Sequence, residues 1–147
     1  MIRILLAALI ISGAFLGSSC WDRRDPEHLA YVIGTGFDVE EDGRFHVIAQ
    51  LANPLVLGGE LGATGGEDKA FWVVSASGYT PLDAMRNLAE GTSRELFWAH
   101  NRVVMFSEEL ARRGIAPVLD LFERQRQLRT IAHPAVVSGD LRTLMEA

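Results

Sequence analysis

The first twenty residues constrain this chain most, because they have the pattern of a secretory signal sequence. Arg3 gives a short positive start, and thirteen uncharged, mostly apolar residues (4–16) follow it. Residues 17–19 then supply the small side chains that a signal peptidase needs at its cleavage site. The apolar stretch is well short of the roughly 20 residues that a permanent membrane-spanning helix requires. We therefore predict a cleaved signal over residues 1–19 and a folded domain over residues 20–147.

Cys20, the only cysteine of the chain, comes directly after these small residues. A thiol at this point is typical of bacterial lipoproteins, in which the cysteine is acylated and becomes the first residue of the mature chain. We predict that Cys20 is lipidated and that two or three acyl chains tether the domain stably to a membrane. The alternatives are a plain secretory signal and a short N-terminal anchor helix. The usual lipoprotein motif has leucine three positions before the cysteine, where this chain has Gly17.

The composition of the remaining chain is that of one globular domain with a hydrophobic core. Once Cys20 is acylated no thiol is left, so we predict no disulfide and no cysteine-based metal site. The formal net charge is −5, and the exported part has no basic cluster. This charge argues against nucleic acid as a partner, and against purely electrostatic docking on anionic lipids. The chain stops inside a segment of helical pattern, from which we expect a C-terminal truncation.

Apolar periodicity predicts three strands in the first half of the domain. Residues 29–38 and 44–52 flank Asp42-Gly43, a strong turn signal, and so predict a β-hairpin. Residues 53–68 carry five glycines and predict a loop, after which residues 70–77 predict the third strand.

Helices and strands alternate in the second half. Thr80-Pro81 gives a helix start, with a hydroxyl N-cap and an apolar stripe that extends to Leu96. We then expect, in order, a strand over 102–106, a short helix between Ser107 and Gly114, a helix over 117–129, a strand over 135–137, and a closing helix from residue 138. This order predicts an α/β or α+β domain with a mixed β-sheet packed by helices.

No combination of residues in the sequence indicates a catalytic or metal site. The glycines of 58–66 are not followed by the Lys-Ser or Lys-Thr of a phosphate-binding loop, and no Gly-x-Ser-x-Gly motif is present. The acidic segment 38–43 begins like a calcium loop but lacks the distal glutamate, which favours a solvated hairpin turn. The polar run 123–129 predicts a solvated helix face or a partner-binding face. The histidines are scattered without metal-ligand spacing: His28, His46, His100 and His133. We therefore predict a domain that is not an enzyme and has no cofactor.

Several segments share their order and pattern with one known family. They are residues 20–24 (CWDRR), 30–38 (AYVIGTGFD), 97–106 (FWAHNRVVMF), 107–115 (SEELARRGI) and 119–129 (LDLFERQRQLR). In these segments the chain resembles the Ger(x)C family of spore germination lipoproteins. Asp25 stands near where that family usually has glutamate.

The resemblance implies the C subunit of a nutrient germinant receptor, tethered on the outer face of the inner spore membrane beside membrane-embedded A and B subunits. It implies a non-enzymatic, multidomain α/β protein longer than this chain, of which residues 20–147 would form the N-terminal domain. From motif position, the candidate partner contacts are His100, Arg102, Arg124 and Arg129. Two other classes stay open: an extracytoplasmic solute-binding lipoprotein of a transporter, and a cell-envelope enzyme.

Overall fold

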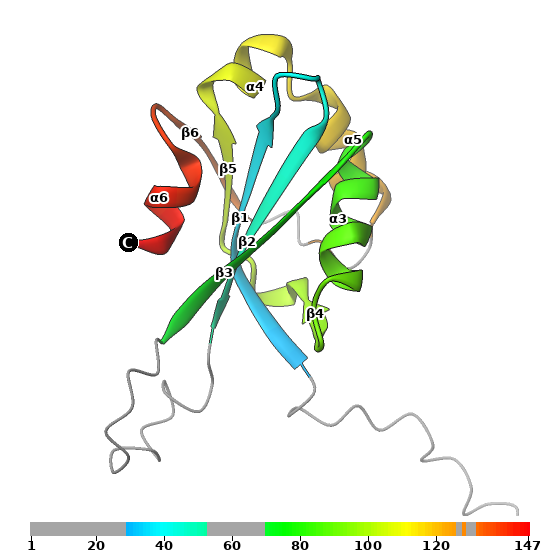
Figure 1. Ribbon diagram of the computed structural model, residues 1–147, viewed down its shortest axis with the longest axis vertical. Coiled ribbons are helices and arrows are strands. Elements are labelled where there is room, and N and C mark those ends of the chain that lie inside the picture. Colours follow the sequence, from blue (N-terminus) through cyan, green and yellow to red (C-terminus); the bar gives the residue numbers. More distant parts are fainter. Residues whose placement is uncertain (1–28, 53–69, 126–127, 129–131) are drawn as a thin grey trace, which may run out of the picture.

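A computed structural model describes residues 29–52, 70–125, 128 and 132–147 of the chain. Within these residues six strands form one mixed sheet, and four α-helices pack on it in an α+β fold (Figure 1). The strand order is β3-β2-β1-β5-β6, and the short strand β4 also pairs with β1. The predicted mixed sheet packed by helices is confirmed. The predicted signal, Cys20, the loop over 53–68 and Arg129 lie outside the described residues.

The first three strands form an antiparallel meander. β1 (Leu29–Val39) and β2 (Phe45–Ala52) are the predicted hairpin, and β3 (Phe71–Gly78) adds to the far side of β2. The hairpin turn needs a glycine, because Gly43 has a φ of 86°, a conformation that other residues rarely adopt. The Asp-Gly signal in the sequence therefore identified the turn for a physical reason.

Helix α3 (Pro81–Glu90) begins where predicted and ends earlier than predicted. The Thr80 side chain accepts a hydrogen bond from the Asp83 N–H, which is the expected N-cap. The helix stops before Gly91, whose N–H donates to Asn87 O, and the expected extension to Leu96 is wrong. Leu96 instead lies in β4 (Glu95–Phe97), which pairs in parallel with the start of β1. Strand pairing has overridden the helical spacing of the apolar side chains.

The second half of the domain supplies the parallel part of the sheet. The 3₁₀ turn η2 (Trp98–His100) leads into β5 (Val103–Ser107), which is parallel to β1. After β5 come α4 (Glu108–Arg113), α5 (Ala116–Arg124), β6 (His133–Val137) and α6 (Leu141–Glu146). The Ser107 side chain caps α4 by accepting from the Leu110 N–H, and the Asp140 carboxylate caps α6 by accepting from the Thr143 N–H, so the closing helix begins later than the expected residue 138. The helix expected over 117–129 is shorter, because Gln125 is already extended on the path to β6.

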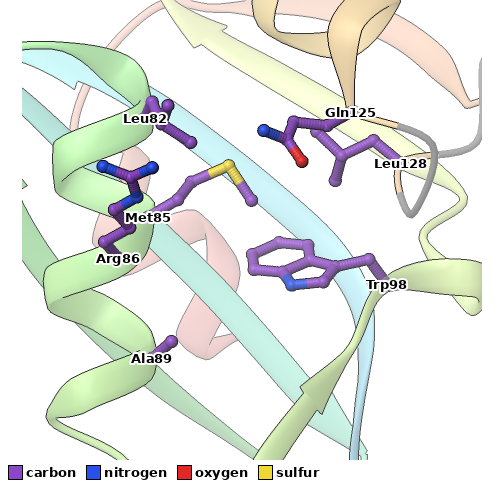
Figure 2. Close-up of a pocket in the computed structure, with 7 residues that line it drawn as sticks. All are labelled: Leu82, Met85, Arg86, Ala89, Trp98, Gln125 and Leu128. Carbon is purple, nitrogen blue, oxygen red and sulfur yellow. The ribbon is translucent and has the colours of Figure 1, made fainter.

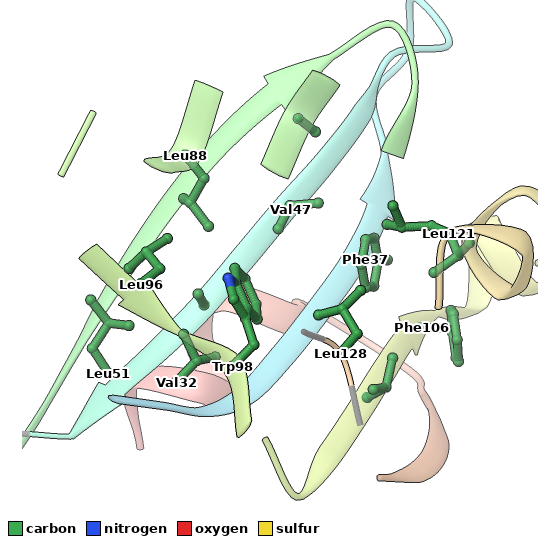
Figure 3. Close-up of a cluster of buried hydrophobic side chains, with 14 of the residues drawn as sticks. Val32, Phe37, Val47, Leu51, Leu88, Leu96, Trp98, Phe106, Leu121 and Leu128 are labelled. Atoms are coloured by element: carbon green, nitrogen blue, oxygen red, sulfur yellow. The ribbon is translucent and has the colours of Figure 1, made fainter. Parts of the chain in front are cut away.

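The two faces of the sheet are covered unequally. The main core lies on the face that carries α3 and α5, and Figure 3 shows Phe37 and Val47 of this face among side chains from both halves of the chain. Phe37 is fully buried, stacked on Phe106 at 6.2 Å between ring centroids and edge-on to Phe122 at 6.1 Å. Helix α6 packs on the opposite face through a smaller cluster with Ile48, formed by Leu141 and Met145.

Close approach of α6 to β1 predicts different effects for two glycines of the same strand. A Cβ at Gly36 would lie 2.7 Å from Leu141 Cδ2 and 2.9 Å from Met145 Sδ, whereas a Cβ at Gly34 would have no neighbour closer than 3.4 Å. We expect Gly36→Ala to weaken the docking of α6 by about 1–3 kcal/mol, the usual cost of overpacking. Amide hydrogen exchange in α6 should be faster in Gly36→Ala and unchanged in Gly34→Ala. Equal exchange in the two variants would contradict this account.

Candidate functional site

Aromatic side chains form a row across one end of the sheet. Tyr31 at the start of β1 pairs with Phe97 of β4 on one side and with Ala52 at the end of β2 on the other. Ala52 in turn pairs with Phe71 at the start of β3. Paired residues of neighbouring strands project to the same face. This is the face that carries α6, because Ala30 and Val32, on either side of Tyr31, belong to the main core on the other face.

His100 joins this row from η2. Its ring lies 5.4 Å from the ring of Tyr31, nearly perpendicular to it, and 5.6 Å from that of Phe97. Tyr31 and Phe97 also meet edge-to-face at 5.8 Å. Tyr31 and Phe97 are half-buried, His100 is exposed, and Phe71 is 40% exposed. We call the four residues Tyr31, Phe71, Phe97 and His100 the aromatic end.

The structure separates the predicted partner-contact residues into two places. His100 and Arg102 lie near each other at the aromatic end, and both are exposed. The Arg102 backbone links the sheet there, because its N–H donates to Ile33 O at 3.0 Å and its carbonyl accepts from the His133 N–H at 2.9 Å. Arg124 lies on α5, which packs on the other face, and is paired with Asp120 at 2.8 Å. Arg129 and Cys20 lie outside the described residues.

The sequence interpretation included His100 and missed the aromatic side chains around it. Tyr31 could have been found, because it alternates with the buried residues Ala30 and Val32 and must therefore face away from the main core. The alternation of buried residues could not have predicted that Phe97 and Phe71 lie beside Tyr31. Their placement depends on which strands pair and in which register, and those contacts are distant in the sequence.

A cavity of about 260 Å³ opens between α3 and η2 (Figure 2). Met85 and Leu128 line it with apolar atoms beside the Trp98 indole, and the polar groups of Arg86 and Gln125 are also in its wall. This volume is below the roughly 300–1,000 Å³ of common small-molecule sites. Its described lining places one guanidinium and one amide beside apolar side chains.

The acidic hairpin turn at the other end of the sheet is paired in part within the chain. Arg44 forms ion pairs with Glu40 at 2.8 Å and with Asp42 at 2.7 Å. Hydrogen bonds from the Arg44 backbone N–H and then from its guanidinium hold the pKa of Asp42 below its usual value. This pairing agrees with the predicted solvated turn. In the part of the chain that the structure describes, no group of three or more His, Cys, Asp or Glu side chains is placed to hold a metal ion.

None of the helices in the described segments has the length and hydropathy needed to cross a bilayer. The aromatic end combines apolar rings with polar groups.

Comparison with known proteins gives a consistent family. The spore germination protein N-terminal domain matches residues 22–147. A protein of Bacillus subtilis (strain 168) that is named as a spore germination protein, YfkR, is 35% identical over 145 residues, covering 96% of this chain and 35% of its own length. Spore germination protein KC of the same organism is 33% identical over 132 residues, covering 88% of this chain and 32% of its own length.

The chain thus spans about a third of the length of these curated relatives. No solved structure matches it significantly. The family match begins two residues after Cys20 and continues to Ala147, so it includes every strand and helix described above. The resemblance noted in the sequence is therefore confirmed, and the chain belongs to the spore germination protein family, of which it carries the N-terminal domain.

Proposed function

We propose that this chain belongs to a membrane-tethered lipoprotein subunit of a nutrient germinant receptor and acts in spore germination by assembling with the A and B membrane subunits. One observation carries the proposal. The germination-protein domain matches from residue 22, so that Cys20, preceded by a signal pattern, stands where the mature lipoprotein would begin. Acyl chains on Cys20 would hold the domain on the outer face of the inner spore membrane, at high effective concentration near its partners.

The role that we propose for the domain is binding, without catalysis. The groups with clearly shifted pKa values in the described residues are exposed and belong to local pairs or caps, such as Asp42 beside Arg44 and Asp140 beside Thr143. Functional pKa shifts usually arise in clefts, where burial and a specific charge act together. The described surface has instead exposed cations and aromatic side chains, which suit contacts with another protein or with lipid.

His100, Arg102, Arg124 and Arg129 are the residues that we propose as partner contacts. His100 and Arg102 share the aromatic end and Arg124 lies on the other face, so the described residues would engage partners from two directions. Replacing all four by alanine should lower the recovery of the A and B subunits with the purified protein, while the circular dichroism of the domain is retained. Intact assembly in the quadruple variant would exclude these residues as the contact set.

Germination of spores tests the proposed function directly. Deleting the gene should abolish the nutrient-triggered loss of heat resistance for particular nutrients, and the intact gene should restore it. Cys20→Ala should fail to restore it, because the protein is no longer acylated and leaves the membrane fraction. Ser19→Ala is the matched control, since it keeps a small side chain before the cleavage site and retains the thiol. Restoration by Cys20→Ala would contradict the tether.

The alternative of a solute-binding lipoprotein has less support. Such proteins enclose their ligands in a pocket, commonly between two lobes, whereas the described residues form one sheet with its helices.

A further inference from the structure

The aromatic end lies at the end of the domain to which the proposed tether is attached. β1 begins at Leu29, which follows Cys20 by nine residues, and Tyr31 lies two residues further on. A fully extended chain spans at most ~3.3–3.6 Å per residue, so nine residues reach ~30 Å at most. An anchor at Cys20 therefore keeps the start of β1, at the lower end of the sheet in Figure 1, close to the membrane surface.

Helix α6 leaves this end of its face uncovered. The last turn of α6 lies over Gln50 of β2, whose side-chain amide donates a hydrogen bond to Met145 O at 2.8 Å. Ala52 lies two residues after Gln50 on β2 and therefore faces the same side of the sheet. It pairs with Tyr31 and Phe71, and this part of the face lies past the end of α6. A hollow of about 460 Å³ separates the end of α6 from Phe71. The aromatic end is thus accessible to a flat partner that approaches the start of β1.

The side chains of the aromatic end have the chemistry of a bilayer interface. Aromatic rings with polar groups concentrate at the headgroup layer, where the ring body is in an apolar medium and the polar tip stays hydrated. Tyr31 and His100 combine a ring with a polar group, and Phe71 and Phe97 add apolar area. Because these rings already pack edge-to-face, their side chains need not lose further conformational freedom when they contact lipid.

Charge favours the same orientation. Arg94 and Arg102 lie beside the aromatic end, together with Glu95. At the opposite end the hairpin turn carries more carboxylates than guanidinium groups, including Glu41, whereas the two carboxylates of α4 are paired with arginines of the same helix. An anionic headgroup layer repels that opposite end, so the net acidic domain approaches the layer best with the aromatic end first.

We infer that the aromatic end is the surface with which the tethered domain rests on the interfacial layer of the phospholipid bilayer. The inference depends on the proposed anchor at Cys20. It requires only weak intrinsic affinity, because a short tether gives an effective concentration of about millimolar. The contact fixes the orientation of the domain, directing α4 and the hairpin turn away from the membrane.

The single thiol allows this orientation to be measured without cellular lipidation. The chain from Cys20 to Ala147 is coupled through Cys20 to a maleimide lipid in vesicles of phosphatidylethanolamine and phosphatidylglycerol that contain a gadolinium-chelate lipid. Paramagnetic broadening of the amide signals then reports proximity to the headgroups. We expect broadening several-fold stronger at Tyr31, Phe97 and His100 than at Gly43 in the hairpin turn.

Two substitutions and a control make the measurement decisive. Phe97→Ser and His100→Ala, the latter at an exposed site, should each reduce the difference in broadening between the aromatic end and the hairpin turn. Tyr79→Ser should leave this difference unchanged. Tyr79 is an 83% exposed tyrosine that follows the opposite end of β3, so it controls for loss of an exposed aromatic side chain. Uniform broadening, or strongest broadening at Leu119 and Val136, would overturn the inference. Absence of acylated Cys20 from spores would instead count against the proposed anchor, which this chemical coupling replaces.

Discussion

Phe37→Ala is expected to lower the free energy of unfolding by about 3–5 kcal/mol, the usual cost of removing a fully buried aromatic ring. Phe37 is completely buried on the central strand and contacts the rings of Phe106 and Phe122. Alanine would remove apolar area and leave a cavity that the paired strands cannot close. Since single domains have a total stability of about 5–15 kcal/mol, the variant should be close to unfolding. Urea titration followed by circular dichroism measures the loss.

Tyr79→Ala is the matched control for this prediction. Its ring is 83% exposed, so its removal should change the stability by no more than about 0.5 kcal/mol. A loss below about 1 kcal/mol for Phe37→Ala would mean that the core does not pack around this ring as described. In spores, the Phe37 variant should also be reduced in amount, because a larger unfolded fraction is removed by proteases.

Gly78→Ala is expected to cost about 3 kcal/mol, at the upper end of the usual range for overpacking. A Cβ at Gly78 would lie 2.3 Å from Ala84 N and 2.8 Å from Ala84 Cα, so it would clash with the backbone of α3 rather than with a movable side chain. Either β3 or α3 must shift, which also strains the hydrogen bond from Asn87 Nδ2 to Ser77 O, at 2.8 Å. Thermal and urea unfolding of the purified domain would measure the cost.

Gly91→Ala, at the other end of α3, provides the comparison. Gly91 has a φ of −76°, and a Cβ there would have no neighbour closer than 3.4 Å. Alanine fits this conformation and restricts the unfolded chain, so we expect a gain of about 0.4–1 kcal/mol. Similar effects of the two substitutions would show that α3 does not approach Gly78 as closely as described.

Local signals in the sequence were sufficient for the starts of elements. Asp42-Gly43 identified the hairpin because only glycine readily adopts the φ found at Gly43. Thr80 and Ser107 identified two helix starts, because their hydroxyl groups satisfy backbone N–H groups that the helix leaves free. In each case the cause lies within a few residues of the signal.

The ends of two helices depended on partners that are distant in the sequence. The apolar spacing after Thr80 continues to Leu96, but Leu96 pairs with Ala30 in the sheet, 66 positions away. Residues 125–133, which follow α5, contain neither glycine nor proline to stop a helix. The helix nevertheless ends at Arg124, because the chain has to place β6 in parallel beside β5. The aromatic end was not predicted for the same reason, since Tyr31, Phe71 and Phe97 meet only through strand register.

The place of β1 in the sheet determines how the domain responds to mechanical force. β1 is hydrogen-bonded to β2 on one side and to β4 and β5 on the other. Ladder hydrogen bonds run across the strands, so a pull at Leu29 along β1 loads many of them together in shear instead of opening them one after another. A pull on the chain ahead of Leu29 and in line with β1 would therefore act on a firmly held strand and would not peel the sheet apart.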